Sequence, residues 1–281
     1  MHQDLAKGFD RMIDALKKDT RCKGGWHYGS VGRGMSDEYS DYDPVFLVPE
    51  KYFEEFARDV KQFVSHACDE ILISWAEDYN SEVFKNFCNL VRINDNLHQL
   101  DFFILNEDKA ENWWCRQHLK GCSRDNIIYD RTGDVAALLD KGLRTENYIP
   151  DPRRCFDTYW FHIEMLIKYF KRKDIFKLLK NIDFVFHAHI DLLLSQYDVL
   201  DWGPWETKVN KCVPREKQEH LLLYYTKPDF RSYEVTLKQA MKFFNEDAIE
   251  AYTKKGLIYP GHIAEQVIEY FNREVSVQEK E

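Results

Sequence analysis

The sequence predicts an α+β fold in which a mixed-sheet domain, residues 1–149, is followed by an all-helical domain, residues 150–281. Three observations support this prediction. Helical and strand-like spacings of apolar residues alternate through residue 135. After Pro150-Asp151-Pro152, almost every apolar pattern is helical. The length of 281 residues is also sufficient for two domains of ordinary size.

Helices and strands alternate in the first predicted domain. Apolar residues at positions 5, 9, 12, 13 and 16 recur at helical spacing, which predicts an amphipathic helix over residues 3–19. A short apolar strand, Trp26–Tyr28, then leads into a glycine-bearing turn over residues 29–34. The later elements of this domain are predicted as a helix at 50–67 and strands at 44–48, 71–75, 87–93, 99–105 and 126–129.

Helical periodicity dominates the second predicted domain. A loop, Trp202–Trp205, interrupts the series because its central glycine and proline are poor helix formers. Ligand pockets are common between domains, so we expect the helical domain to close a substrate cleft. The predicted helices lie at residues 154–171, 173–200, 215–226, 231–246 and 260–274.

The composition is that of a globular protein, with 44% hydrophobic and 31% charged residues. The formal net charge of −9 argues against nucleic-acid binding, which usually needs a basic surface. No apolar run approaches the roughly 18 residues that a membrane-spanning helix needs, and no signal peptide is apparent. The seven cysteines form no CxxC pair, which is typical of reduced thiols. We therefore expect a soluble, cytoplasmic protein without nucleic-acid or membrane partners.

The segment from Tyr28 to Asp43 has the residue types of a phosphate site. Three glycines at positions 29, 32 and 34 allow sharp turns and let backbone N–H groups approach an anion closely. Ser30 adds a hydroxyl donor at the bend, and Arg33 adds a positively charged guanidinium suited to phosphate. The segment therefore predicts a phosphate-binding turn.

Acidic residues follow this turn at strand-like spacing. Asp41 and Asp43 are two residues apart where a strand begins, so both carboxylates point to one face. Two neighbouring carboxylates repel each other unless a cation lies between them. Asp101 lies inside a strand-like run over residues 98–105, where an unpaired charge is expensive, and Gln99 shares its face. Carboxylates beside a phosphate turn predict a magnesium–nucleotide site.

The pattern of Gly29-Ser30, then Asp41-x-Asp43, then the strand residue Asp101 is similar to the nucleotidyltransferase superfamily typified by DNA polymerase beta. Within that superfamily the chain most resembles the aminoglycoside 6-adenylyltransferase (streptomycin adenylyltransferase) and lincosamide nucleotidyltransferase families, which modify antibiotics. The resemblance extends more loosely over residues 128–133 and 159–174.

This resemblance implies a role for each motif residue. Gly29 and Ser30 are implied to hold the β- and γ-phosphates of a nucleoside triphosphate, with ATP as the donor. Asp41 and Asp43 are implied to bind two Mg²⁺ ions, and Asp101 to complete the shell of one of them. The implied reaction transfers AMP to a hydroxyl of an aminoglycoside-like small molecule and releases pyrophosphate.

The general base for this reaction has two candidates. On the predicted helix 154–171, Glu164 and Lys168 lie on one polar stripe. If that stripe faces the cleft, Glu164 serves as base and Lys168 contacts the triphosphate. In other related enzymes the third strand carboxylate is the base instead, so Asp101 is the second candidate. A third interpretation is that Glu164 and Lys168 form only an exposed ion pair.

The resemblance leaves the acceptor and the assembly open. A lincosamide, another small metabolite or a protein side chain is an alternative acceptor. A nucleotide-binding module of the same fold without turnover is a further alternative. The sequence is compatible with a monomer or a homodimer.

Overall fold

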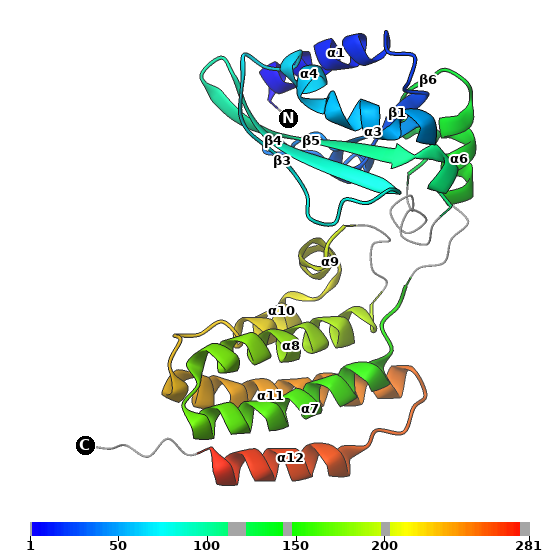
Figure 1. Ribbon diagram of the computed structural model, residues 1–281. Coiled ribbons are helices and arrows are strands. Elements are labelled where there is room, and N and C mark those ends of the chain that lie inside the picture. The colour runs from blue at the N-terminus through cyan, green and yellow to red at the C-terminus, as the bar shows by residue number, and fades with distance from the viewer. Residues whose placement is uncertain (1, 112–121, 143–147, 198–202, 276–281) are drawn as a thin grey trace. The chain divides into compact units, whose positions relative to one another are not determined.

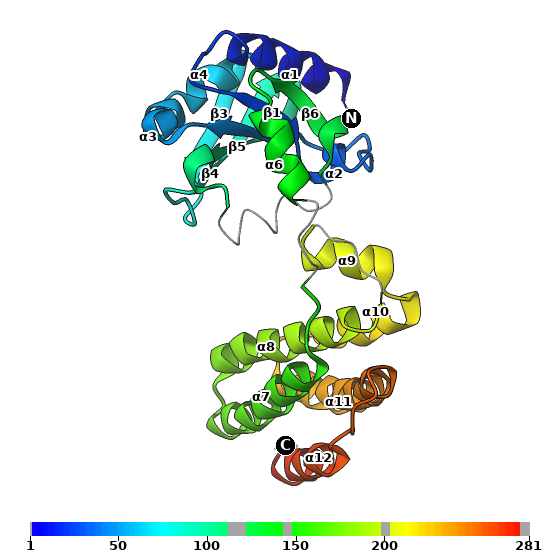
Figure 2. The ribbon, with the colours of Figure 1, turned by 90° about the vertical axis from the view of Figure 1, so that its right-hand side faces the viewer.

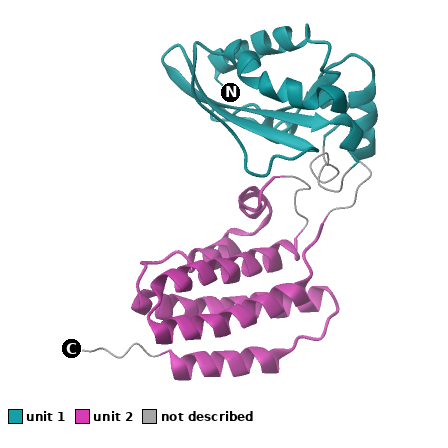
Figure 3. Cartoon of the chain, viewed as in Figure 1, with its two compact units in different colours: residues 1–147 teal, residues 148–281 magenta. Residues whose placement is uncertain are grey.

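The computed structural model describes residues 2–111, 122–142, 148–197 and 203–275. The chain divides into two compact units, residues 1–147 and 148–281, which are coloured separately in Figure 3. The first contains a mixed sheet with helices, and the described part of the second contains helices alone, so the predicted fold class is confirmed. Within the described ranges, no helix is both long enough and apolar enough to cross a membrane.

The first unit is built on a six-stranded sheet. Its strands are β1 (Gly24–His27), β2 (Pro44–Val48), β3 (Glu70–Ala76), β4 (Phe84–Ile93), β5 (Asn96–Asn106) and β6 (Ile127–Asp130). Their order across the sheet is β3-β4-β5-β2-β1-β6. β2 and β5 run parallel, whereas the other neighbouring strands are antiparallel. The sheet is therefore mixed, with β2 and β5 at its centre.

Helices cover both faces of this sheet unequally. The described helices of the unit are α1 (Gln3–Leu16), α2 (Gly29–Gly32), α3 (Glu50–Arg58), α4 (Val60–Ser65) and α6 (Asp134–Gly142). Figures 1 and 2 show α1, α3 and α4 on one side of the sheet, where they pack with Phe46 and Phe102. A second buried cluster, with Val45 of β2 and residues of α6, lies on the opposite face because strand side chains alternate.

The second unit is a helical bundle around a single buried cluster. Its described helices are α7 (Pro152–Arg172), α8 (Ile175–Leu194), α9 (Trp205–Cys212), α10 (Arg215–Leu222), α11 (Phe230–Lys254) and α12 (Gly261–Glu274). Asp151 caps α7 by accepting a hydrogen bond from the Arg153 backbone, and Pro152 occupies the first turn. In the core, the rings of Tyr159 and Phe244 stack with centroids 3.5 Å apart.

Several helix boundaries differ from the predicted ones for local reasons. The predicted helix at 50–67 is divided at Asp59, which ends α3 and precedes α4. Lys173 has a left-handed backbone and Asp174 caps α8, so α7 ends cleanly before α8 begins. Residues 198–200 of the predicted helix 173–200, and Trp202 of the predicted loop, lie outside the described residues.

Among the described residues, three α-helices were not predicted. The glycine-bearing segment forms the one-turn helix α2 rather than a simple turn. The helices α6 and α9 are only nine and eight residues long, so each contains few repeats of the helical pattern. Trp205, predicted to lie in a loop, is the first residue of α9.

Candidate active site

The glycine-bearing turn lies directly against the first acidic pair. Gly29 has a left-handed backbone, with a φ of +58°, which glycine adopts at little cost. A Cβ atom at Gly29 would lie 2.1 Å from Oδ2 of Asp43, so any larger residue would displace that carboxylate. The backbone N–H of Tyr28 also donates to the carbonyl oxygen of Asp43 at 3.1 Å. The turn therefore needs a glycine at this position to sit beside the carboxylate.

Ser30 and Arg33 belong to the same short segment. Ser30 lies within α2, and Arg33 is the residue that follows this helix. The side-chain amide of Asn126 donates to the carbonyl oxygen of Gly32 and so ties α2 to the segment before β6. Ser30 and Arg33 are both half-buried. The predicted phosphate-binding residues thus occupy one turn, anchored from a distant part of the chain.

Three carboxylates converge on one face of the sheet. Asp41 and Asp43 precede β2, and Asp101 lies in β5, the parallel neighbour of β2. The backbone N–H of Asp101 donates to the carbonyl oxygen of Tyr42 at 3.1 Å, which aligns the two strands at this level. One carboxylate oxygen from each aspartate lies within 4.8 Å of the others. We call the face that carries Asp43 and Asp101 the carboxylate face.

The three carboxylates are poorly compensated by the protein itself. Burial, with added repulsion from Asp41 and Asp101, raises the pKa of Asp43 to about 7. Burial also raises the pKa of Asp101 to about 6, although a hydrogen bond from Gln99 partly opposes this shift. The pKa of Asp41 is raised for the same reason, burial. Among the described residues, no lysine, arginine or histidine forms an ion pair with these aspartates.

These properties fit a divalent metal ion. Magnesium prefers oxygen ligands, and carboxylates are its usual protein ligands beside substrate phosphates. A cation among the three oxygens would offset the cost of burying the Asp43 charge, which is the main cause of its raised pKa, and the added repulsion from Asp41 and Asp101. Asp41, Asp43 and Asp101 are therefore suited to hold Mg²⁺.

Residues on neighbouring strands surround Asp101, and most of them were not singled out from the sequence. Gln99 shares the face of Asp101, as strand alternation predicts, and donates to Oδ1 of Asp101 at 3.4 Å. Cys88 of β4 pairs with Asp101 in the sheet register. The Cys88 thiol lies 3.0 Å from Oε1 of Glu77. The sequence does not identify Cys88 and Glu77 as neighbours of Asp101, because strand pairing rather than local spacing brings them close to it.

Glu164 and Lys168 lie in the second unit, on α7. Their side chains form an i,i+4 ion pair, with Nζ of Lys168 2.9 Å from Oε2 of Glu164. The Glu164 and Lys168 side chains are 39% and 46% exposed. This arrangement is the exposed ion pair that the sequence left open as one interpretation, and a catalytic role for either residue stays a prediction.

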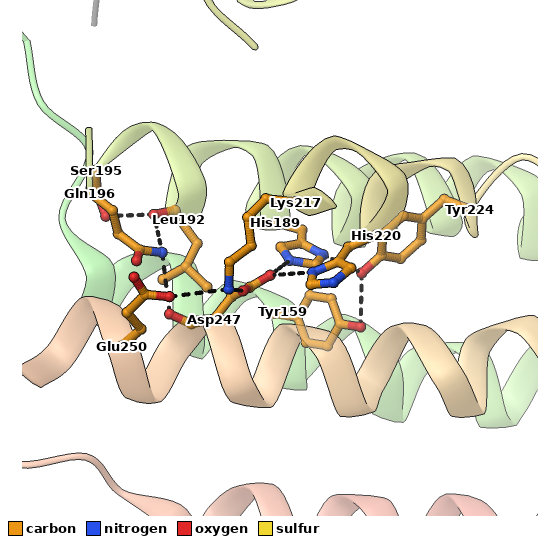
Figure 4. A network of polar contacts seen from close by, with 10 residues as sticks. All are labelled: Tyr159, His189, Leu192, Ser195, Gln196, Lys217, His220, Tyr224, Asp247 and Glu250. Carbon is orange, nitrogen blue, oxygen red and sulfur yellow. Dashed lines mark hydrogen bonds and ion pairs between the residues drawn. The ribbon is translucent and has the colours of Figure 1, made fainter. Parts of the chain in front are cut away.

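A second polar cluster lies buried in the helical unit, and Figure 4 shows its side chains. Asp247 of α11 has no exposed surface. Its Oδ2 atom lies 2.8 Å from Nε2 of His189 and 3.0 Å from Nδ1 of His220, while Lys217 contacts Oδ1. Hydrogen bonds from these groups hold the pKa of Asp247 down, at about 2, despite its burial. Lys217 also pairs with Glu250 at 3.1 Å.

This second cluster joins three helices and is electrically balanced. It connects α8, α10 and α11 through His189, Lys217 and Asp247. The other ring nitrogen of His189 lies 3.0 Å from the Tyr224 hydroxyl, which in turn is hydrogen-bonded to the Tyr159 hydroxyl at 3.0 Å. Because the Lys217 ammonium already compensates the Asp247 carboxylate, the geometry is that of a structural hydrogen-bond network.

Comparison with known proteins gives a family match over most of the chain. The family model described as Streptomycin adenylyltransferase matches residues 6–274. Among solved structures, the chain is similar to an aminoglycoside 6-adenyltransferase from Bacillus subtilis, with 13% sequence identity and a TM-score of 0.41. That alignment covers 97% of this chain and 98% of the other. No match was found among curated proteins.

The family match spans both units and includes the glycine turn and the three carboxylates. The resemblance predicted from the motif is therefore confirmed, and it lies with the streptomycin branch. The protein is an enzyme of the adenylyltransferase class. From its motif, its site and this match, the chain belongs to the streptomycin adenylyltransferase family.

Proposed function

We propose that this enzyme transfers AMP from ATP to a hydroxyl group of an aminoglycoside and releases pyrophosphate. The observation that carries the proposal is the convergence of Asp41, Asp43 and Asp101 beside the glycine turn. The family match supports both the adenylyl group and the class of acceptor. The raised pKa values of Asp43 and Asp101 support a site that awaits a cation.

We propose two Mg²⁺ ions for this site, which Asp41 and Asp43 would hold, with Asp101 completing the shell of one of them. When bound, the ions supply positive charge that neutralises the triphosphate and stabilises the attacking and leaving oxygens. The protein contributes fixed positions, because Asp43 and Asp101 are held by the parallel pairing of β2 with β5. Positioning and charge neutralisation supply most of the rate in phosphoryl chemistry.

The glycine turn orients the donor. Backbone N–H groups at Gly29 and the hydroxyl of Ser30 hold the β- and γ-phosphates, and Arg33 adds positive charge. The α-phosphorus then faces the carboxylates. The acceptor oxygen forms a new bond to this phosphorus while the bond from the α-phosphorus to the bridging oxygen breaks, and pyrophosphate leaves with that oxygen. The acceptor proton moves to a carboxylate of the protein.

Asp101 is our first candidate for that carboxylate, and Glu164 is the second. Asp101 belongs to the carboxylate cluster at the proposed reacting centre, within reach of an acceptor hydroxyl placed there. Glu164 is engaged with Lys168, which we propose as a further triphosphate contact if the pair opens. We expect Glu164→Gln to keep most of the turnover rate and Asp101→Asn to abolish it. Loss of turnover in Glu164→Gln with unchanged ATP binding would move the base to Glu164.

A direct assay tests the function. The protein is incubated with ATP, Mg²⁺ and streptomycin, and the acceptor is analysed by mass spectrometry alongside pyrophosphate release. We expect streptomycin, or another aminoglycoside in a panel, to gain one AMP group. A gain on a lincosamide only would replace the acceptor class. Calorimetric binding of ATP with magnesium but no transfer to any acceptor would instead indicate a non-catalytic nucleotide-binding module.

A further inference from the structure

One row of residues runs across three strands and ends at the carboxylate cluster. Trp75 of β3 pairs with Cys88 of β4, and Cys88 pairs with Asp101 of β5. Residues paired in register project to the same face of a sheet, so all three side chains lie on the carboxylate face. Neighbouring strands are roughly 4.8 Å apart, which puts Trp75 about 10 Å from Asp101 along this row. That distance is comparable to the length of a two-ring sugar.

The far end of this row is open to solvent. α6 packs on β1 and β6, near the edge of the sheet opposite to the edge formed by β3. β3 is an edge strand, and its residues Ile73 and Trp75 are 49% and 51% exposed. Cys88, between Trp75 and Asp101, is small and only 8% exposed, so its side chain does not project between them and leaves room for a ligand above the sheet. The row therefore presents an exposed indole at one end and the carboxylates at the other.

The charge on this surface is negative. Glu77 follows β3, and its Oε1 atom lies 3.0 Å from the Cys88 sulfur. In the described part of the chain, no basic side chain forms an ion pair with Glu77. A triphosphate is repelled by such a carboxylate, whereas an ammonium or guanidinium group is attracted. The surface is therefore complementary to the acceptor and not to the donor.

We propose that Trp75, Glu77 and Cys88 form an acceptor platform on which a cationic aminoglycoside lies during transfer. A cationic group pairs with the Glu77 carboxylate, and a sugar ring or guanidinium group packs on the Trp75 indole. The reacting hydroxyl then lies over Asp101, at the end of the row. Trp75 and Glu77 determine acceptor affinity and take no part in the bond changes. This inference rests on the proposed function, because it assigns a place to that acceptor.

Steady-state kinetics of Glu77→Gln and Trp75→Ala test the platform. We expect each variant to raise the KM for streptomycin about tenfold or more, because a charge-assisted contact or a cation–aromatic contact is lost. The KM for ATP should change less than about twofold, since the donor lies at the glycine turn. Asp78→Asn changes the charge equally one residue away, and Phe176→Ala removes an 81% exposed aromatic ring in the other unit. Both controls should leave the two KM values unchanged.

Calorimetry without ATP separates this inference from the proposed function. Streptomycin should bind the wild-type protein, bind Glu77→Gln at least about tenfold more weakly, and lose part of its salt dependence in that variant. If the wild-type enzyme adenylylates streptomycin but both variants bind it normally, the platform is wrong and the function stands. If the wild-type protein binds streptomycin on the platform but transfers no AMP, the platform stands and the proposed reaction fails. If no aminoglycoside binds, both proposals fail.

Discussion

Two clusters of this chain, one around Asp43 and one around Asp247, have opposite electrostatics. In the sheet unit, burial and neighbouring acids raise the pKa of Asp43 to about 7. In the helical unit, Asp247 is fully buried, yet hydrogen bonds from His189, Lys217 and His220 hold its pKa at about 2. The residue type is the same, and the difference lies in the donors that surround it. Burial alone therefore does not distinguish a binding site from a structural network.

The two clusters differ in whether the protein itself supplies a compensating cation. The Asp43 cluster is assembled without compensating cations among the described residues, which is the arrangement expected if it binds the proposed metal ion. The Asp247 cluster carries its own cation, Lys217, and joins three helices. We therefore expect the first cluster to lower the stability of the metal-free protein and the second to stabilise the fold.

The largest expected effect is on the first cluster. Asp43→Asn should reduce turnover by at least roughly 10³-fold, because it removes a proposed metal ligand from the reacting centre. In the absence of metal at pH 8, the same variant should be more stable than the wild-type protein by about 2 kcal/mol, since a buried charge and its repulsion by the neighbouring acids are removed. Pyrophosphate release measures the first effect, and urea unfolding in EDTA measures the second.

Asp78→Asn is the matched control for this variant, because Asp78 is an exposed acid of the same unit. It should change neither turnover nor the free energy of unfolding by more than about 0.5 kcal/mol. A metal-free Asp43→Asn protein less stable than the wild type would contradict the expected cost of the buried charge.

The second cluster should respond in the opposite direction. Asp247→Asn should lower the free energy of unfolding by about 3–5 kcal/mol, because it removes the charge that compensates Lys217 and replaces one of the two acceptor oxygens by an amide NH₂ group. Urea unfolding measures the change. Glu246→Gln, an adjacent residue of α11 whose nearest ion-pair partner Lys242 is 3.9 Å away, should change stability by less than about 0.5 kcal/mol. An Asp247→Asn effect as small as that control would show that the network contributes no stability.

The two clusters also differ in how far sequence alone revealed them. Asp41 and Asp43 were predicted as site residues because their spacing of two matches a strand. Asp101 was predicted because an unpaired charge inside an apolar strand is costly unless it binds a partner. Asp247 gave no such signal. It is followed and preceded by ordinary helical residues, and its partners lie 30 and 58 positions away in the chain. Only helix packing brings them together.

The same physical reason limits the prediction around the active site. The fold class followed from periodicity, which is local, and the structure confirms it. Trp75 and Cys88 face Asp101 through strand register, which depends on the β-bulge between Ile71 and Ile73 and on pairing partners that no local pattern specifies. Gly29 was predicted as a flexible turn residue, but its closeness to Asp43 appears only in three dimensions.

The pH dependence of stability should have two limbs without metal. Asp247 has a folded pKa below its ordinary value of 3.8, so its contribution is full above pH 4 and is lost as the pH falls toward 2. Asp43 has a folded pKa above that value, so the folded state binds an extra proton and stability falls as the pH rises from about 4 to about 7. Each limb amounts to about 2–4 kcal/mol.

Urea unfolding in EDTA at pH values between 3 and 8 measures both limbs. Asp43→Asn should reduce the upper limb, part of which remains because the pKa of Asp101 is also raised, and should leave the lower limb; Asp247→Asn should do the reverse. Saturating Mg²⁺ should flatten the upper limb, because a cation holds all three carboxylates ionised. An upper limb of the same size in Asp43→Asn and in the wild-type protein would assign it to other groups.

The smallest expected effect separates the neutral part of the Asp247 network from its charged part. Tyr224→Phe removes the hydroxyl that contacts both Nδ1 of His189 and the hydroxyl of Tyr159. It should cost about 1–2 kcal/mol, because buried polar atoms lose their partners while the Asp247–Lys217 pair remains. Tyr225→Phe, which alters a 66% exposed neighbour, is the control and should be neutral in urea unfolding. If Tyr224→Phe is also neutral, the network stabilises the fold through the groups that contact Asp247 directly, and the contrast with the Asp43 cluster lies in His189, Lys217 and His220.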